Sequence, residues 1–197
     1  MKKIIFLIVV CILIFIIYIL NVDKKILYLT LGNNLDVNIN MEVKKILEEN
    51  NKYEDSILEF SNINYKTTDL IKDILNNKII IKDNKNISLN NSLVKSELIV
   101  LNIGYYDYKD YLNNNLFNNI DIIKNDMDTL LKEIRKITKE KVVLIGVKND
   151  SINDKYLEII NNVYKKVCKD NNIYYLNIFD NLSISRELKK YIENDII

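Results

Sequence analysis

The sequence predicts a three-layer α/β/α sandwich built on a five-stranded parallel sheet. Short apolar runs rich in β-branched residues alternate with longer segments of helical periodicity, which is the pattern of repeated βα units. The chain has three glycines and no proline, and every glycine directly follows an apolar run. A chain so poor in glycine keeps it where the backbone needs positive φ or close approach. Loops with special backbone geometry are therefore expected at the carboxyl ends of three strands.

Composition bounds the possible functions. The chain has 197 residues, of which 48% are hydrophobic, enough for one domain plus a short extra segment. A net charge of +1 gives no reason to expect nucleic acid as a partner. The absence of histidine excludes Ser-His and Cys-His catalysis and His-ligated zinc from this chain alone. Cys11 and Cys168 do not suggest a disulfide framework, and neither a metal nor a cofactor is expected.

Residues 1–22 are predicted to form a single transmembrane anchor. Two lysines precede an uninterrupted apolar run, Ile4–Leu20, at the short end of what spans a bilayer. The alternative, a cleaved signal peptide, needs small residues before the cut, and this segment has no Ala, Gly or Ser. Lipidation is disfavoured because Cys11 follows Val10 and the apolar run continues past it. We expect a single-pass protein of the cell membrane whose domain, residues 25–197, is extracytoplasmic.

Five apolar runs are predicted to be the strands. The first and third end at Gly32 and Gly104, and the fourth contains Gly146. The third is nearly continuous in apolar residues, as expected of a central parallel strand covered on both faces. The expected strands are Ile26–Leu31, Ser56–Ser61, Leu98–Ile103, Val142–Val147 and Ile173–Ile178.

Helices are predicted between the strands because apolar residues recur there at helical spacing. Thr67 or Thr68 is expected to cap the second helix, and Ser151 with Asp154 to form a capping box. Residues 78–96, rich in Asn and Lys, are expected to be a surface loop with a short helix near Leu89–Lys95. The expected helices are Asp36–Asn50, 67–77, Ile120–Thr138, a helix from Ser151 through Val167, and Ser185–Ile197.

The loops resemble the motif blocks of the SGNH/GDSL hydrolase superfamily. Gly32–Leu35 stands where family members carry G-D-S-L, and Asn64–Leu70 stands where a glycine precedes a TTDL-like helix start. Gly104–Asp107 corresponds to the G-x-N-D block, and Asp180–Ser183 to D-x-x-H. The resemblance covers the domain from about residue 25 onward. It implies a sandwich of SGNH-hydrolase or flavodoxin-like type, similar to membrane-anchored or secreted members from low-GC Gram-positive bacteria.

The departures from the family pattern fall on its catalytic positions. The nucleophilic serine position holds Asn34, the oxyanion glycine position holds Asn64, and the oxyanion asparagine position holds Tyr106. A carboxamide is not a usable nucleophile, and no histidine is present to act as the base. The resemblance thus implies a hydrolase scaffold that has lost esterase activity, with no catalytic residue to name.

A degenerate cleft for ligand binding is expected at the carboxyl ends of the strands. Asn side chains donate and accept, which suits glycan hydroxyl and acetamido groups, and tyrosines add aromatic faces. The alternatives stay open: drift in an Asn-rich chain, or loop carboxylates, among them Asp36 and Asp69, that cap helices rather than act in catalysis. The expected positions are Gly32, Asn33, Asn34, Asn64, Gly104, Tyr106, Asp107, Asp180 and Ser183.

Three functions are compatible with these observations. The first is an extracytoplasmic binding or scaffolding module whose partner is a cell-wall glycan. The second is an active hydrolase of acyl esters on glycans or lipids with a rearranged site. The third is a structural remnant whose only partner is another membrane protein.

Overall fold

The computed structural model describes residues 26–33, 39–53, 58–82, 84–113, 120–148, 155–178 and 184–197. The predicted anchor lies outside these ranges, and no helix within them is long and apolar enough to cross a bilayer. The elements are β1 (Tyr28–Asn33), α2 (Ile39–Glu49), β2 (Leu58–Asn62), α3 (Thr67–Leu75), β3 (Ile79–Lys82), β4 (Lys85–Ser88), α4 (Leu89–Lys95), β5 (Leu98–Asn102), α5 (Tyr105–Asn113), α6 (Ile120–Ile137), β6 (Lys141–Ile145), α7 (Lys155–Asp170), β7 (Tyr174–Leu176) and α8 (Ile184–Asp195).

The predicted parallel sheet is confirmed. Its five strands lie in the order β2-β1-β5-β6-β7, and each neighbouring pair is parallel. The chain therefore winds outward in both directions from the boundary between β1 and β5, where Gly32 lies opposite Asn102. In open α/β sheets, ligands bind at the carboxyl ends of the strands beside this boundary. The segments that end at Gly32 and Gly104 are neighbours, as the sequence predicted.

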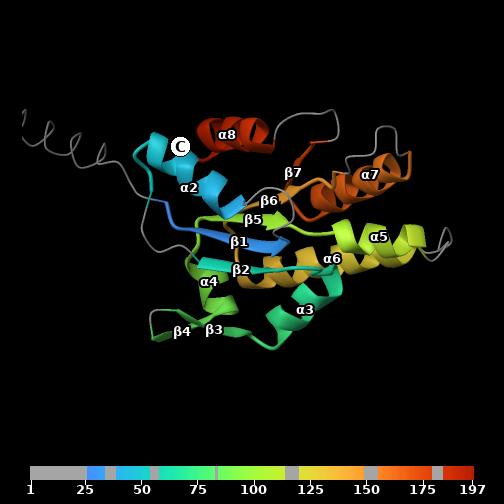
Figure 1. The fold of residues 1–197 in the computed structure, drawn as a ribbon, viewed down its shortest axis with the longest axis horizontal. Coiled ribbons are helices and arrows are strands. Elements are labelled where there is room, and N and C mark those ends of the chain that lie inside the picture. The colour runs from blue at the N-terminus through green and yellow to red at the C-terminus, as the bar shows by residue number, and fades with distance from the viewer. Residues whose placement is uncertain are drawn as a thin grey trace, which may run out of the picture.

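The sheet separates two layers of helices (Figure 1). Successive side chains of a strand point to opposite faces, and β5 shows this directly. Leu98 and Val100 pack with α2 and α8 on one face, whereas Ile99 and Leu101 pack with α3, α4, α6 and α7 on the other. All four side chains are fully buried, so the continuous apolar run of β5 is explained by burial on both faces.

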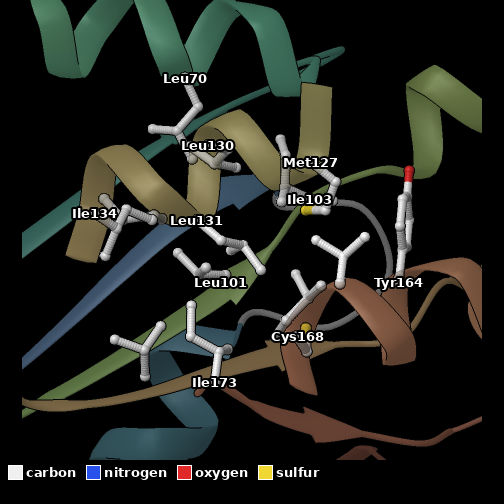
Figure 2. Packing of buried hydrophobic residues seen from close by; sticks show 14 of the residues in the cluster. Leu70, Leu101, Ile103, Met127, Leu130, Leu131, Ile134, Tyr164, Cys168 and Ile173 are labelled. Atoms are coloured by element: carbon white, nitrogen blue, oxygen red, sulfur yellow. The ribbon is translucent and has the colours of Figure 1, made fainter. Parts of the chain in front are cut away.

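The larger core lies between the sheet and helices α6 and α7. Figure 2 shows Leu131 of α6 above Leu101 of the sheet, Met127 beside Ile103, and Leu130 on the side of α6 toward Leu70 of α3. The sequence predicts that one face of α6 is lined by Ile123, Met127, Leu130, Leu131, Ile134 and Ile137. The first five are buried, which confirms the predicted face. For α7 the sequence predicts a face of Ile152, Tyr156, Ile159, Ile160, Val163 and Val167, and for the described residues this is partly wrong. Its inward positions include Leu157 and Tyr164, while Ile159 is 43% exposed.

Three local features differ from what the sequence predicts. Residues 78–96 hold not only the expected helix, α4, but also the antiparallel hairpin β3–β4. Tyr105–Asn113 forms a helix, α5, that the sequence did not indicate because it has no clear apolar stripe. Lys66, rather than Thr67 or Thr68, is the N-cap of α3. Asp69 does lie in the first turn of that helix, where its carboxylate accepts from the Lys66 N–H at 3.2 Å.

Asparagine takes over the conformational role of the missing glycines. Every described non-glycine residue with positive φ is an asparagine. Asn is the residue after Gly that most readily adopts the left-handed region. Part of the Asn-rich composition is therefore structural. The residues are Asn51, Asn64, Asn77, Asn84 and Asn172.

We expect Asn172→Ala to lower the free energy of unfolding by about 1 kcal/mol, because the left-handed backbone conformation is less favourable for alanine than for asparagine. Asn172 ends α7 with φ of 53°, a position where glycine is favoured. Asn172→Gly is therefore expected to be neutral or slightly stabilising. Urea unfolding of the two variants measures the difference, and equal loss in both would contradict a conformational role.

Candidate functional site

The carboxyl ends of β1, β2 and β5 lie side by side and form the carboxyl edge of the sheet. Each of these strands ends in an asparagine. Asn33 lies opposite Asn62 of β2, and Gly32 lies opposite Asn102 of β5. This edge is where the sequence placed the degenerate cleft. Of the predicted site residues, Asn34, Asp180 and Ser183 lie outside the described residues, as does Asp36.

Gly32 is required by its surroundings. Its φ is +112°, and a Cβ atom built there would lie 2.1 Å from the carbonyl oxygen of Asn102. Glycine is thus needed both for its backbone conformation and for the close approach of two neighbouring strands. The prediction that glycine marks such a position is confirmed here. It is also confirmed at Gly104, where φ is +106° and a Cβ would meet the Tyr164 ring.

Asn33 is a structural residue of this edge. Its side chain is 2% exposed. Its Nδ2 donates to the carbonyl oxygen of Tyr65, and its Oδ1 accepts from the Tyr65 N–H, both at 2.8 Å. Asn102 Nδ2 donates to the backbone oxygen of Asn33 at 2.6 Å. These amides tie the loop after β2 to the ends of β1 and β5, so Asn33 presents no face to a ligand.

Asp107 is also engaged within the protein. Its carboxylate accepts from the Thr67 N–H at 3.1 Å and from the Thr67 hydroxyl at 2.9 Å. It therefore satisfies one of the free N–H groups at the start of α3 from another element. Burial raises the pKa of Asp107 above its ordinary value of 3.8, outweighing the opposing effect of the Thr67 hydrogen bonds. A second tie between the same elements is the ion pair of Lys66 with Asp110.

The Thr67–Asp107 pair does not form an accessible nucleophile. A hydroxyl bonded to a carboxylate is the beginning of a nucleophile–base arrangement. However, the Thr67 side chain is only 1% exposed, and its hydroxyl is the first-turn partner of Asp107. A substrate carbonyl has no access to it.

Among the predicted site residues that the structure describes, Asn64 and Tyr106 have side chains open to a partner. Asn64 is exposed and has φ of +60°, so it keeps a glycine-like backbone at the position where the SGNH pattern has glycine. Tyr106 is half-buried. Its ring packs edge-on against Tyr105 with centroids 5.3 Å apart, and the Lys109 ammonium lies 5.8 Å from its centroid. The contacts of Thr67 and Lys66 with α5 bring these two positions to the same edge.

Several residues that shape this edge were missed by sequence reasoning. Tyr65 supplies only backbone atoms, which leave no sequence signal. Asn161 bonds both polar groups of Val147 at 2.8 Å and secures the end of β6. Two features of the sequence could have pointed to these residues. Asn102 is the one polar residue in the apolar run before Gly104, and Asn161 directly follows Ile160, which is predicted to face the core.

No group of three or more Cys, Asp or Glu side chains among the described residues could hold a metal ion. Two hollows that described residues line lie at the opposite edge of the sheet. One of about 410 Å³ is lined by Arg135, Lys141, Tyr174 and Tyr191, among others. Arg135 is committed to the backbone there, since it donates to the carbonyl oxygens of Glu140, Asn171 and Asn172.

No family model and no curated protein matches the sequence, but solved structures match the fold. The lipase Lip_vut3 from a goat rumen metagenome superposes with a TM-score of 0.62 at 16% identity, over 86% of this chain and 96% of that chain. An acetyl-xylooligosaccharide esterase from Geobacillus gives 0.59 at 11% identity, over 87% and 94%. A GDSL-like protein from Parabacteroides merdae gives 0.58 at 14% identity, over 87% and 86%.

The chain has the SGNH-hydrolase fold. The resemblance drawn from the loop motifs is therefore confirmed at the level of architecture. At these identities the similarity establishes the fold alone, and the activities in those names belong to those proteins. In this chain Gly32 and Gly104 have positive φ, and the carboxyl edge carries amides, a buried threonine and a phenol.

We expect Asp107 to make the stability of the domain fall as pH rises. Because its pKa is raised in the folded state, its contribution is fully present below the unfolded value of about 3.8 and is lost as pH rises through the folded value. Glu49 and Asp128 have lowered pKa values and give slopes of the opposite sign, so the contribution of Asp107 is measured as a difference. In urea unfolding from pH 3 to pH 7, the wild type should lose stability relative to Asp107→Asn as pH rises, while Asp126, whose pKa burial also raises, contributes to the slope of both proteins. An unchanged slope in Asp107→Asn would contradict the assignment.

Proposed function

We propose that the protein is a membrane-anchored, extracytoplasmic binding module on an SGNH-hydrolase fold, without ester-hydrolase activity. The observation that supports the proposal is that polar groups at the carboxyl edge are hydrogen-bonded within the protein. Asn33 bonds the Tyr65 backbone and Asp107 bonds Thr67, so these groups hold loops together instead of facing a substrate. The chain also lacks histidine.

Ester hydrolysis by this fold needs a nucleophile, a base and oxyanion donors. The nucleophile position holds Asn34, whose amide does not attack a carbonyl. Without a base whose pKa lies near neutrality, serine and threonine hydroxyls stay protonated. Among the described residues of this edge, Thr67 has its hydroxyl bonded to a carboxylate, that of Asp107, but Thr67 is buried.

A glycan of the cell wall is the partner that the open residues support best. Asn64 offers a donor and an acceptor in one exposed side chain, which suits hydroxyl and acetamido groups. Tyr106 offers an aromatic ring on the adjacent element, and sugar rings pack their C–H faces against such rings. In the same proposal, the apolar run Ile4–Leu20 anchors the chain in the membrane and the domain lies outside the cell. The carboxyl edge would then be within reach of the cell wall.

The experiment is an isothermal calorimetric titration, in which an N-acetylglucosamine tetramer is added to the full chain in lipid nanodiscs. We expect saturable binding that Tyr106→Ala weakens at least tenfold. The matched control is Tyr174→Ala, because Tyr174 is 47% exposed and lies at the opposite edge, stacked on Tyr191. Absence of binding, or equal weakening by both variants, would contradict a glycan site at the carboxyl edge.

An active hydrolase is the second candidate, favoured by the fold neighbours that are named lipases and esterases. It would need a nucleophile that the described edge does not present. Turnover that is lost on changing Asn34 or Asp107 to Ala would establish it.

A further inference from the structure

The β3–β4 hairpin exposes two isoleucines, Ile79 and Ile81, which pair with Ser88 and Asn86 of the other strand. Ile80 pairs with Ile87 across the hairpin, and both pack against the main core. Ile79 and Ile81 point the other way because side chains alternate along a strand. They are 59% and 77% exposed. One face of the hairpin thus belongs to the core, and the other offers isoleucine to the surroundings.

The end of the hairpin is basic. Lys82 lies opposite Lys85, and both are exposed. Residues 82–85 contain two lysines and one aspartate, a net charge of +1, whereas Lys78 at the base of the hairpin is paired with Asp73 at 2.6 Å. Apolar side chains flanked by lysines are the pattern of segments that enter the interface of an anionic bilayer, with isoleucine among the acyl chains and ammonium groups at the headgroups.

The hairpin points toward the same side of the molecule as the amino ends of the sheet strands, where β1 begins (Figure 1). In the sequence, only residues 21–25 separate the apolar run ending at Leu20 from Ile26. Six residue steps span at most about 20 Å. If the apolar run crosses the bilayer, as the proposed function requires, the amino edge of the sheet is held at the membrane surface.

We propose that the tip of the β3–β4 hairpin inserts into the headgroup region of the anionic bilayer to which the chain is anchored. Ile81 would enter the interface, and Lys85 would contact anionic headgroups. The anchor and the hairpin then make two attachments on one side of the domain. The carboxyl edge, with Asn64 and Tyr106, faces away from the membrane.

The test uses the full chain in nanodiscs containing phosphatidylglycerol, with a spin label at Ile81→Cys in a Cys11→Ser background. Cys168 is buried, and burial raises the pKa of its thiol to about 12, so it does not compete for the label. The matched control is Ile63→Cys, because Ile63 is 78% exposed but follows the carboxyl end of β2. We expect the label at 81 to be more accessible to oxygen than to a water-soluble nickel complex, and the label at 63 to show the reverse.

The outcomes separate this inference from the proposed function. Adding Lys85→Glu should shift the label at 81 toward water, which supports the headgroup contact. Two water-exposed labels on a chain that stays in the disc would overturn the insertion and leave the anchor standing. Spin–spin broadening at 81 would assign the face to a second copy and overturn the lipid assignment. A chain that is not retained by the discs would overturn both proposals.

Discussion

Gly32→Ala is expected to lower the free energy of unfolding by about 4 kcal/mol or more, a large part of the stability of a typical domain. The φ of +112° is unfavourable for any residue with a Cβ. In addition, that Cβ would lie 2.1 Å from the carbonyl oxygen of Asn102, a backbone atom in a fully packed central strand that has no room to retreat. Urea unfolding of the detergent-solubilised chain, followed by circular dichroism, measures the loss.

Gly146→Ala is the control for this prediction. Gly146 does not have positive φ, and its Cβ would meet the end of a side chain, the Tyr175 hydroxyl, at 2.5 Å. A side-chain end can move at lower cost than a strand, so a clearly smaller loss is expected. If both glycines tolerate alanine equally, the close approach between β1 and β5 does not exist as described.

Asn33→Ala is expected to cost about 3 kcal/mol of stability. It removes two buried hydrogen bonds and leaves the Tyr65 N–H and carbonyl oxygen without these partners, and each such buried group costs about 1–3 kcal/mol. The exposed Asn162 on α7 provides the control, since Asn162→Ala should change stability by less than about 0.5 kcal/mol. A stable Asn33→Ala variant would return Asn33 to the list of ligand-binding candidates.

The sheet could be predicted from the sequence because burial leaves a strong local signal. Continuous apolar runs such as Leu98–Ile103 read as strands, and scarce glycines mark their ends. The hairpin β3–β4 and helix α5 could not be predicted in the same way. Their residues are polar, aromatic or isoleucine without a clean period. Their surroundings come from other elements, since β4 contacts α4 and α5 is bonded to the start of α3 through Asp107 and Asp110.

The edge itself was predicted, but the roles of its residues were not. Asn33 and Asp107 were expected to face a ligand, and instead they bond groups 32 and 40 positions away in the chain. Such pairings follow from the arrangement of strands and leave no mark in local spacing. For Asn64, in contrast, the sequence did predict a special role. Its place in the SGNH motif predicted a special backbone position, and its positive φ agrees.

The central claim is that the SGNH frame persists while its polar edge has become structural. The most direct test is multiple-turnover hydrolysis of p-nitrophenyl acetate by the detergent-solubilised full chain. We predict no saturable turnover beyond the background acylation of lysines, and the same rate for the wild type, Asp107→Asn and the urea-unfolded chain. Saturable turnover in the wild type that disappears in Asp107→Ala or Asn34→Ala would contradict the claim and establish an enzyme.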